Sequence, residues 1–167
     1  MAAKKDKKAR RLARKRKVQR RTPSSGQQIL LQRVRASQHL PNTQVIVNPA
    51  GTEKMSEVIL RFAEPLQDDD GMMPKAMIDI AIIIWNASFM PQDMQRKALE
   101  DIIDVLPRDA SEARREMLLM VHMLLERKKQ YFSHNKRLIV DYHITESARS
   151  IHLDVVSTIP EGYHPER

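Results

Sequence analysis

Twelve of the first 21 residues are lysine or arginine, and such a segment cannot build a core of its own. Its one acid is Asp6, so its net charge is +11, and beyond Met1 its only sizeable apolar residues are Leu12 and Val18. Like charges three and four positions apart repel in an isolated helix. We expect this segment, the basic tail (residues 1–21), to be disordered alone and helical when bound to a polyanion. The fold must come from the rest of the chain.

The remainder of the chain carries the opposite charge. From Thr22 onward there are 17 basic and 20 acidic residues, a net charge of −3, so the overall +8 comes from the basic tail alone. This asymmetry indicates a nucleic-acid partner or another acidic surface for the tail. The residues predicted to follow a phosphate backbone, by counterion release and with little sequence preference, are Lys4, Lys5, Lys7, Lys8, Arg10, Arg11, Arg14, Lys15, Arg16, Lys17, Arg20 and Arg21.

Breaks in composition divide the chain into four parts. The Thr-Pro-Ser-Ser-Gly run that starts at Thr22 is a typical break, and Pro41-Asn42 is another. The predicted parts are a basic tail with its linker (1–26), a short helix or connector (27–42), a globular domain (43–160) and a frayed end (161–167).

The apolar periodicity predicts one short helix and four longer ones. Ser25 and Gln28 resemble a capping box for the short helix, as Asp109 and Glu112 do for the longest one. The second long helix is apolar on nearly all sides and should be the most buried. The four longer helices are expected at about 52–66, 74–89, 91–106 and 110–132.

Two alternating segments near the end of the chain, 136–145 and 150–158, predict an antiparallel β-hairpin. Residues 43–48 are β-branched and are a candidate third strand. The predicted fold class is therefore α+β and mainly α. It consists of a bundle of about four helices followed by a C-terminal antiparallel hairpin, with a basic N-terminal extension.

The hairpin also carries a cluster of histidines and aspartates. If the turn pairs Glu146 with Arg149, then His143 faces His152 and Asp141 faces Asp154 across the two strands. Two His and two Asp could bind a divalent metal or act as a general base. The simpler alternative, which we favour, is that these residues form the solvated face of an amphipathic hairpin.

Asp79 and Asn86 are the polar residues within the most apolar helix, seven positions apart and thus on one side of it. They mark either a narrow exposed edge or a buried polar pair that fixes a neighbouring element. Because buried aspartate is rare, the exposed edge is the preferred interpretation.

Other classes of site find no support in the sequence. The chain has no cysteine, which excludes disulfides and thiolate chemistry. It also lacks the P-loop, HExxH, GxSxG and dinucleotide motifs, so we expect no cofactor, no bound metal and no enzymatic activity. No apolar run reaches the ~20 residues of a membrane span, and we expect a cytoplasmic protein, or a nuclear one if the basic tail is an import signal.

Three functions remain as hypotheses. The first is a non-enzymatic protein that binds structured RNA or a ribonucleoprotein through the basic tail, with RNA favoured over DNA. The second is a helical protein–protein adaptor whose basic tail is a targeting signal. The third, and the least favoured, is a metal-dependent enzyme that uses Asp141, His143, His152 and Asp154.

Overall fold

The computed structural model describes residues 25–36, 52–147 and 150–158. The basic tail, the candidate strand at 43–48 and the predicted frayed end at 161–167 lie outside these ranges.

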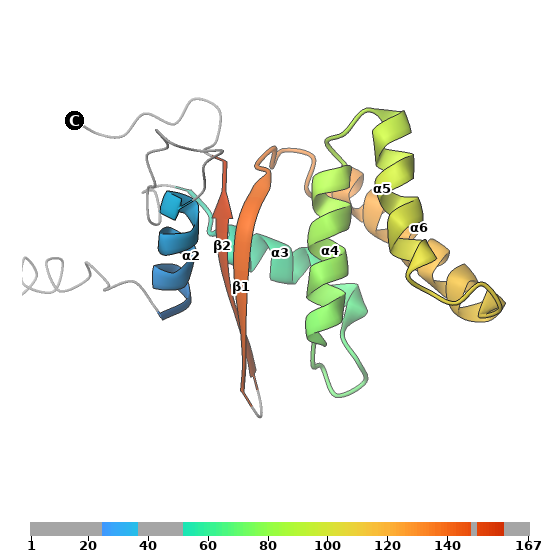
Figure 1. The fold of residues 1–167 in the computed structure, drawn as a ribbon, viewed down its shortest axis with the longest axis horizontal. Coiled ribbons are helices and arrows are strands. Elements are labelled where there is room, and N and C mark those ends of the chain that lie inside the picture. The colour runs from blue at the N-terminus through green and yellow to red at the C-terminus, as the bar shows by residue number, and fades with distance from the viewer. Residues whose placement is uncertain (1–24, 37–51, 148–149, 159–167) are drawn as a thin grey trace, which may run out of the picture.

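The described chain has five α-helices and a two-stranded antiparallel sheet (Figure 1), which confirms the predicted α+β, mainly α, class. One 3₁₀ turn, η1, directly follows α3. The elements in chain order are α2 (Ser25–Ala36), α3 (Met55–Ala63), η1 (Glu64–Leu66), α4 (Lys75–Ala87), α5 (Gln92–Asp104), α6 (Ser111–Tyr131), β1 (Ile139–Ser147) and β2 (Ser150–Ser157).

Prolines set three of the helix boundaries. Pro74 and Pro91 occupy the N-cap positions of α4 and α5, and Pro65 lies in the 3₁₀ turn after α3. The capping box predicted for α6 is wrong, because Ala110 is its N-cap residue and no side chain caps this end. Helix α3 likewise begins after Lys54, and its N-cap side chain makes no capping hydrogen bond.

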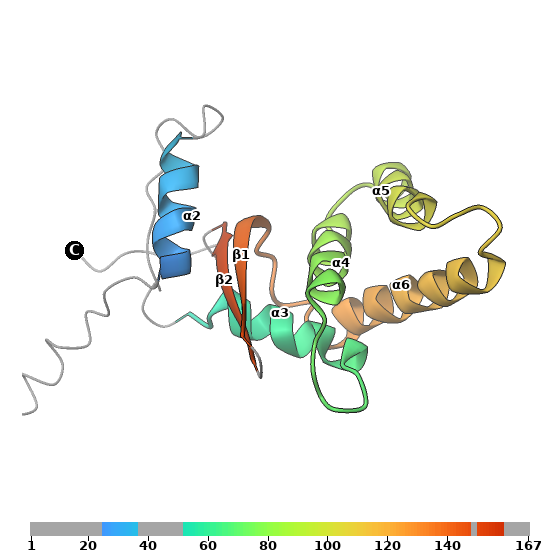
Figure 2. The ribbon, with the colours of Figure 1, turned by 60° about the horizontal axis from the view of Figure 1, so that its bottom comes forward.

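The hairpin is packed between helices on both faces. Helix α2 lies on one face, and α3 and α4 lie on the other (Figures 1 and 2). Helices α5 and α6 continue from α4 on the side away from the hairpin (Figure 2). Helix α2 therefore packs mainly on the hairpin, and the hairpin in turn packs on α3 and α4.

The core centres on an aromatic cluster where α3, α4 and the end of α6 meet. The rings of Phe62, Trp85 and Phe132 contact one another edge to face, with centroids 5.2 to 5.9 Å apart. Both Phe62 and Trp85 are fully buried. Edge-to-face pairs add to the free energy of burying the rings. As predicted, α4 is deeply buried: Ile78, Ala81, Ile84 and Trp85 have no exposed surface.

The register of the hairpin differs from the predicted one. Ser147 pairs with Ser150, so His143 faces Asp154, Thr145 faces His152 and Asp141 faces Val156. A bulge between Ile139 and Asp141 also shifts the alternation of β1. Consequently Ile139 is buried, whereas Leu138 and Val140 are 41% and 47% exposed.

Candidate functional site

Helix α2 links the basic tail to the domain, and its apolar face is docked on the hairpin. Leu30 and Val34 are buried against the strands, at 2% and 4% exposure. Ile29, one position before Leu30, is 41% exposed and lies off this face. Positions 26, 30 and 34 are successive i, i+4 steps, so Gly26 lies on the docked side as well.

Gly26 brings the first turn of α2 against the second strand. A Cβ atom at this position would clash with the Asp154 carboxylate and would lie 2.9 Å from Cδ2 of His143. A larger residue here would require the Asp154 carboxylate, the helix or the strand to shift. Asp154 is 5% exposed, and its carboxylate thereby sits at the N-terminal end of a helix, where the helix dipole favours a negative charge.

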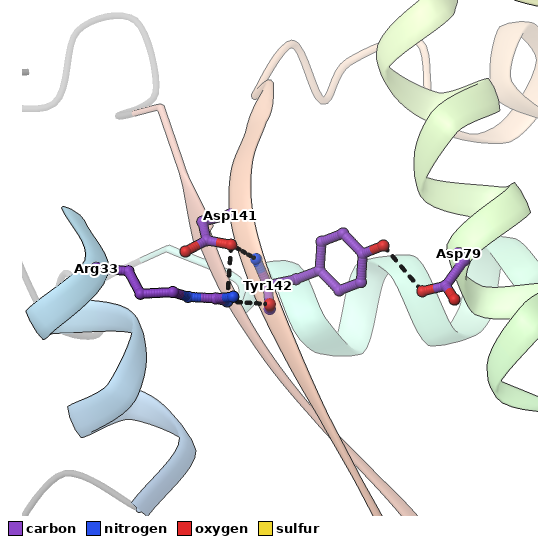
Figure 3. A network of polar contacts seen from close by, with 4 residues as sticks. All are labelled: Arg33, Asp79, Asp141 and Tyr142. Carbon is purple, nitrogen blue, oxygen red and sulfur yellow. Dashed lines mark hydrogen bonds and ion pairs between the residues drawn. The ribbon is translucent and has the colours of Figure 1, made fainter. Parts of the chain in front are cut away.

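Arg33 holds the same helix to the first strand. One of its terminal nitrogens donates to Oδ1 of Asp141 at 2.8 Å and to the backbone oxygen of Tyr142 at 2.6 Å. The same Asp141 oxygen accepts the Tyr142 backbone N–H at 2.8 Å (Figure 3). These contacts fix the register of α2 along β1.

The polar contacts continue across the strand into α4. The Tyr142 ring projects from the opposite face of the hairpin, and its hydroxyl donates to Oδ1 of Asp79 at 2.8 Å (Figure 3). The other oxygen of Asp79 accepts from Lys75 at 2.8 Å. Burial, together with the Asp79 carboxylate, raises the pKa of Tyr142 to about 12. The raised pKa keeps the hydroxyl protonated, and so able to donate, above pH 10 as well.

Asn86 anchors the hairpin to the other end of α4. Its amide donates to the Ile139 carbonyl at 2.8 Å and accepts from the Ile139 N–H at 2.9 Å. Asp79 and Asn86 thus both fix a neighbouring element. Our preferred interpretation, an exposed edge, was wrong, because this side of α4 faces the hairpin and satisfies polar atoms of β1.

The predicted cluster of two histidines and two aspartates does not form. His143 and Asp154 face each other, and His152 Nε2 is 3.4 Å from Asp154 Oδ1. Asp141 faces Val156 instead, and its carboxylate binds Arg33. The face is solvated only in part: α2 packs against it where Asp154 is 5% exposed, whereas the His152 side chain is 65% exposed. Within the described ranges, no group of three His, Asp or Glu residues is placed to hold a metal ion.

Sequence reasoning did not single out Gly26, Arg33 or Tyr142, which carry the α2 contacts. A signal was present for Gly26, because a glycine lowers helix stability and here shares a face with Leu30 and Val34. Such a combination indicates close packing. Nothing local identifies Asp141 as the partner of Arg33, since 108 positions separate them.

The twelve basic residues predicted to bind nucleic acid all lie outside the described ranges. No helix in the described part of the chain is long and apolar enough to cross a membrane. A comparison of the chain with protein-family models, characterised proteins and solved structures found no match.

Proposed function

We propose that the chain is a non-enzymatic nucleic-acid-binding protein whose basic tail binds structured RNA or a ribonucleoprotein. The single observation that carries the proposal is the segregation of charge. Twelve basic residues and one acid lie within residues 1–21, while the rest of the chain has a net charge of −3. A polyanion is the complementary partner for this charge density.

The packing of α2 gives the tail a defined point of attachment. Only three residues separate Arg21 from Ser25, the first residue of α2. Docking of α2 by Leu30, Val34 and Arg33 therefore fixes where on the domain the tail begins. Because one end of the tail is already fixed, less conformational entropy is lost when a single partner binds both the tail and the domain.

RNA is favoured over DNA because of the residue types available. The tail contains six arginine side chains, and each can bind phosphate in a bidentate manner or stack on an unpaired base. Helices of the described domain carry many acids and so are poorly suited to enter a DNA groove. Folded RNA offers both phosphates and unstacked bases to an extended basic segment.

A salt titration tests the proposal. RNA binding is measured for the full-length chain and for a chain without residues 1–21. If the tail contacts about 8 phosphates of single-stranded RNA, log affinity falls against log salt with a slope of about −6. The slope should vanish with the tail.

A full-length variant with the twelve lysines and arginines of the tail changed to glutamine is the matched control for length. It should behave like the deletion, and circular dichroism should show an unchanged domain. Weak binding that neither variant alters would contradict the proposal. A duplex DNA of equal length tests the preference for RNA.

A protein–protein adaptor is the second candidate, because apolar side chains are exposed at α5 and just beyond its two ends. Met90, Met94 and Val105 are 39%, 56% and 84% exposed. For an adaptor, removal of the tail changes location in the cell while protein binding survives.

A further inference from the structure

Helix α6 has an inner face and an unpartnered outer face. Val121, Leu124 and Lys128 are buried toward α3, α4 and α5. On the other sides of the helix, Leu118, Leu119 and Met123 are 53%, 62% and 39% exposed. Figure 2 shows α6 along one border of the molecule, with no described element beyond it.

One set of exposed residues on this side has the spacing of a coiled coil. We name this set the outer seam of α6: Glu112, Arg115, Leu119, His122, Glu126 and Lys129. They recur at alternating steps of three and four, and each of them is exposed. Leu118 and Met123 flank them.

The charges of the outer seam are complementary to themselves when a second copy runs antiparallel. In that arrangement, positions whose numbers sum to a constant face each other. One register places Glu112 against Lys129 and Arg115 against Glu126, each twice by symmetry. At the centre of this register, Leu119 faces the His122 ring, with the apolar side chains of Leu118 and Met123 beside the pair.

Other arrangements lack this match. A parallel pair sets Arg115 against Arg115 and Glu126 against Glu126, and like charges at such positions repel. A shift of the antiparallel pair by one heptad places either Lys129 or Arg115 against Leu119. The outer seam thus selects one orientation and one register.

From this complementarity we infer that two copies of the chain associate through antiparallel pairing of their α6 helices. The inference does not depend on RNA binding, because the outer seam contains no residue of the basic tail or of α2. Exposed apolar surface supplies the attraction, and the terminal charge pairs define the register.

Charge reversal tests the pairing directly. The association of the nuclease-treated, full-length chain is measured by sedimentation up to about 0.5 mM, which reaches the weak end of specific interfaces. Arg115→Glu alone and Glu126→Arg alone should each weaken association at least tenfold. The double variant, and an equimolar mixture of the two single variants, should restore it.

Rescue of this kind must occur between copies. Positions 115 and 126 are eleven residues apart, which is about 16 Å along a helix, so they cannot pair within one chain. Arg96→Glu on α5 makes the same charge change away from the outer seam and should leave association unchanged. Circular dichroism should show every variant folded.

Several results would overturn the inference. A wild-type chain that remains monomeric throughout the range would exclude a second copy as the occupant and would leave the outer seam to a different protein. Association that withstands both single reversals, or that the mixture and the double variant fail to restore, would place the interface elsewhere.

Discussion

The Tyr142 hydroxyl lies 2.8 Å from Asp79 Oδ1, and this hydrogen bond joins the hairpin to α4 from the face opposite α2. Backbone atoms of the same tyrosine contact Arg33 and Asp141 on the α2 side. One residue of β1 therefore takes part in both interfaces of the hairpin. Changes to the Tyr142 side chain should therefore weaken the contact with α4 and leave the backbone contact with Arg33 of α2 in place.

Tyr142→Phe should lower the free energy of unfolding by about 1–2 kcal/mol, because a hydrogen bond to a partly buried carboxylate is lost while the ring remains. Denaturant unfolding at neutral pH measures the loss. Tyr131→Phe is the matched control, since that side chain is 57% exposed, and it should change stability little. Equal effects of the two variants would contradict the role given to the bond.

The raised pKa of Tyr142 also predicts a dependence on alkaline pH. The unfolded tyrosine ionises near 10.0, whereas the pKa in the folded chain is about 12. The stabilisation is fully present below pH 10 and is lost as the pH rises toward 12, because the unfolded state then releases the proton first. The difference in stability between the wild type and Tyr142→Phe should shrink across this window. A constant difference would contradict the assigned pKa.

Asn86→Ala should destabilise the chain by about 2–4 kcal/mol, since it leaves both the N–H and the carbonyl of Ile139 without their partner. Asn86→Asp is the informative comparison, because it keeps an acceptor for the N–H but loses the donor to the carbonyl. It should fall between the wild type and Asn86→Ala in thermal unfolding. An alanine variant as stable as the wild type would show that water replaces the amide.

Helix positions and fold class could be predicted from local patterns, as the match for α4 shows. Its apolar run and the preceding Pro74 are signals contained within about fifteen residues. Asp79 and Asn86 could not be assigned in this way. Their role depends on β1, more than fifty positions away, and only the packed structure brings the two elements together.

The hairpin shows a second limit. Its strands were predicted, but the connection lacks the Asn-Gly or Asp-Gly pair that would mark the turn, so the sequence did not specify the register. The bulge that buries Ile139 in place of Val140 has no local signal either. The packing of α2 on the strand face that carries His143 was not predicted, because an amphipathic hairpin by itself implies a solvated polar face.

Gly26→Ala should loosen α2 even though alanine is the better helix former. The added methyl group would clash with the Asp154 carboxylate, so the carboxylate, the helix or the strand must shift. We expect faster hydrogen exchange in residues 25–36, with the core of α4 unchanged. Gln32→Ala, on the exposed side of α2, should leave exchange in the helix the same or slower. Faster exchange in the Gln32 variant alone would contradict the close approach at Gly26.

Lys128→Met tests a buried cation at the end of α6. The ammonium group donates to the carbonyls of Phe132 and Asn135 and lies 4.3 Å from the centre of the Trp85 ring. Replacing it removes this donor from the Asn135 carbonyl and leaves the Phe132 carbonyl with the Asn135 N–H, and should cost about 1–3 kcal/mol at neutral pH. Burial also lowers the pKa of Lys128 below 10.5 in the folded chain.

Between that lowered pKa and 10.5, the unfolded state holds the proton more tightly, so Lys128 makes stability rise with pH there. The methionine variant should lack this contribution, and its stability deficit should grow across the window. Lys129→Met, at an exposed position in the same turn, is the control and should show no such trend. A deficit for Lys128→Met that stays constant from neutral pH to pH 10.5 would show that burial does not perturb this lysine.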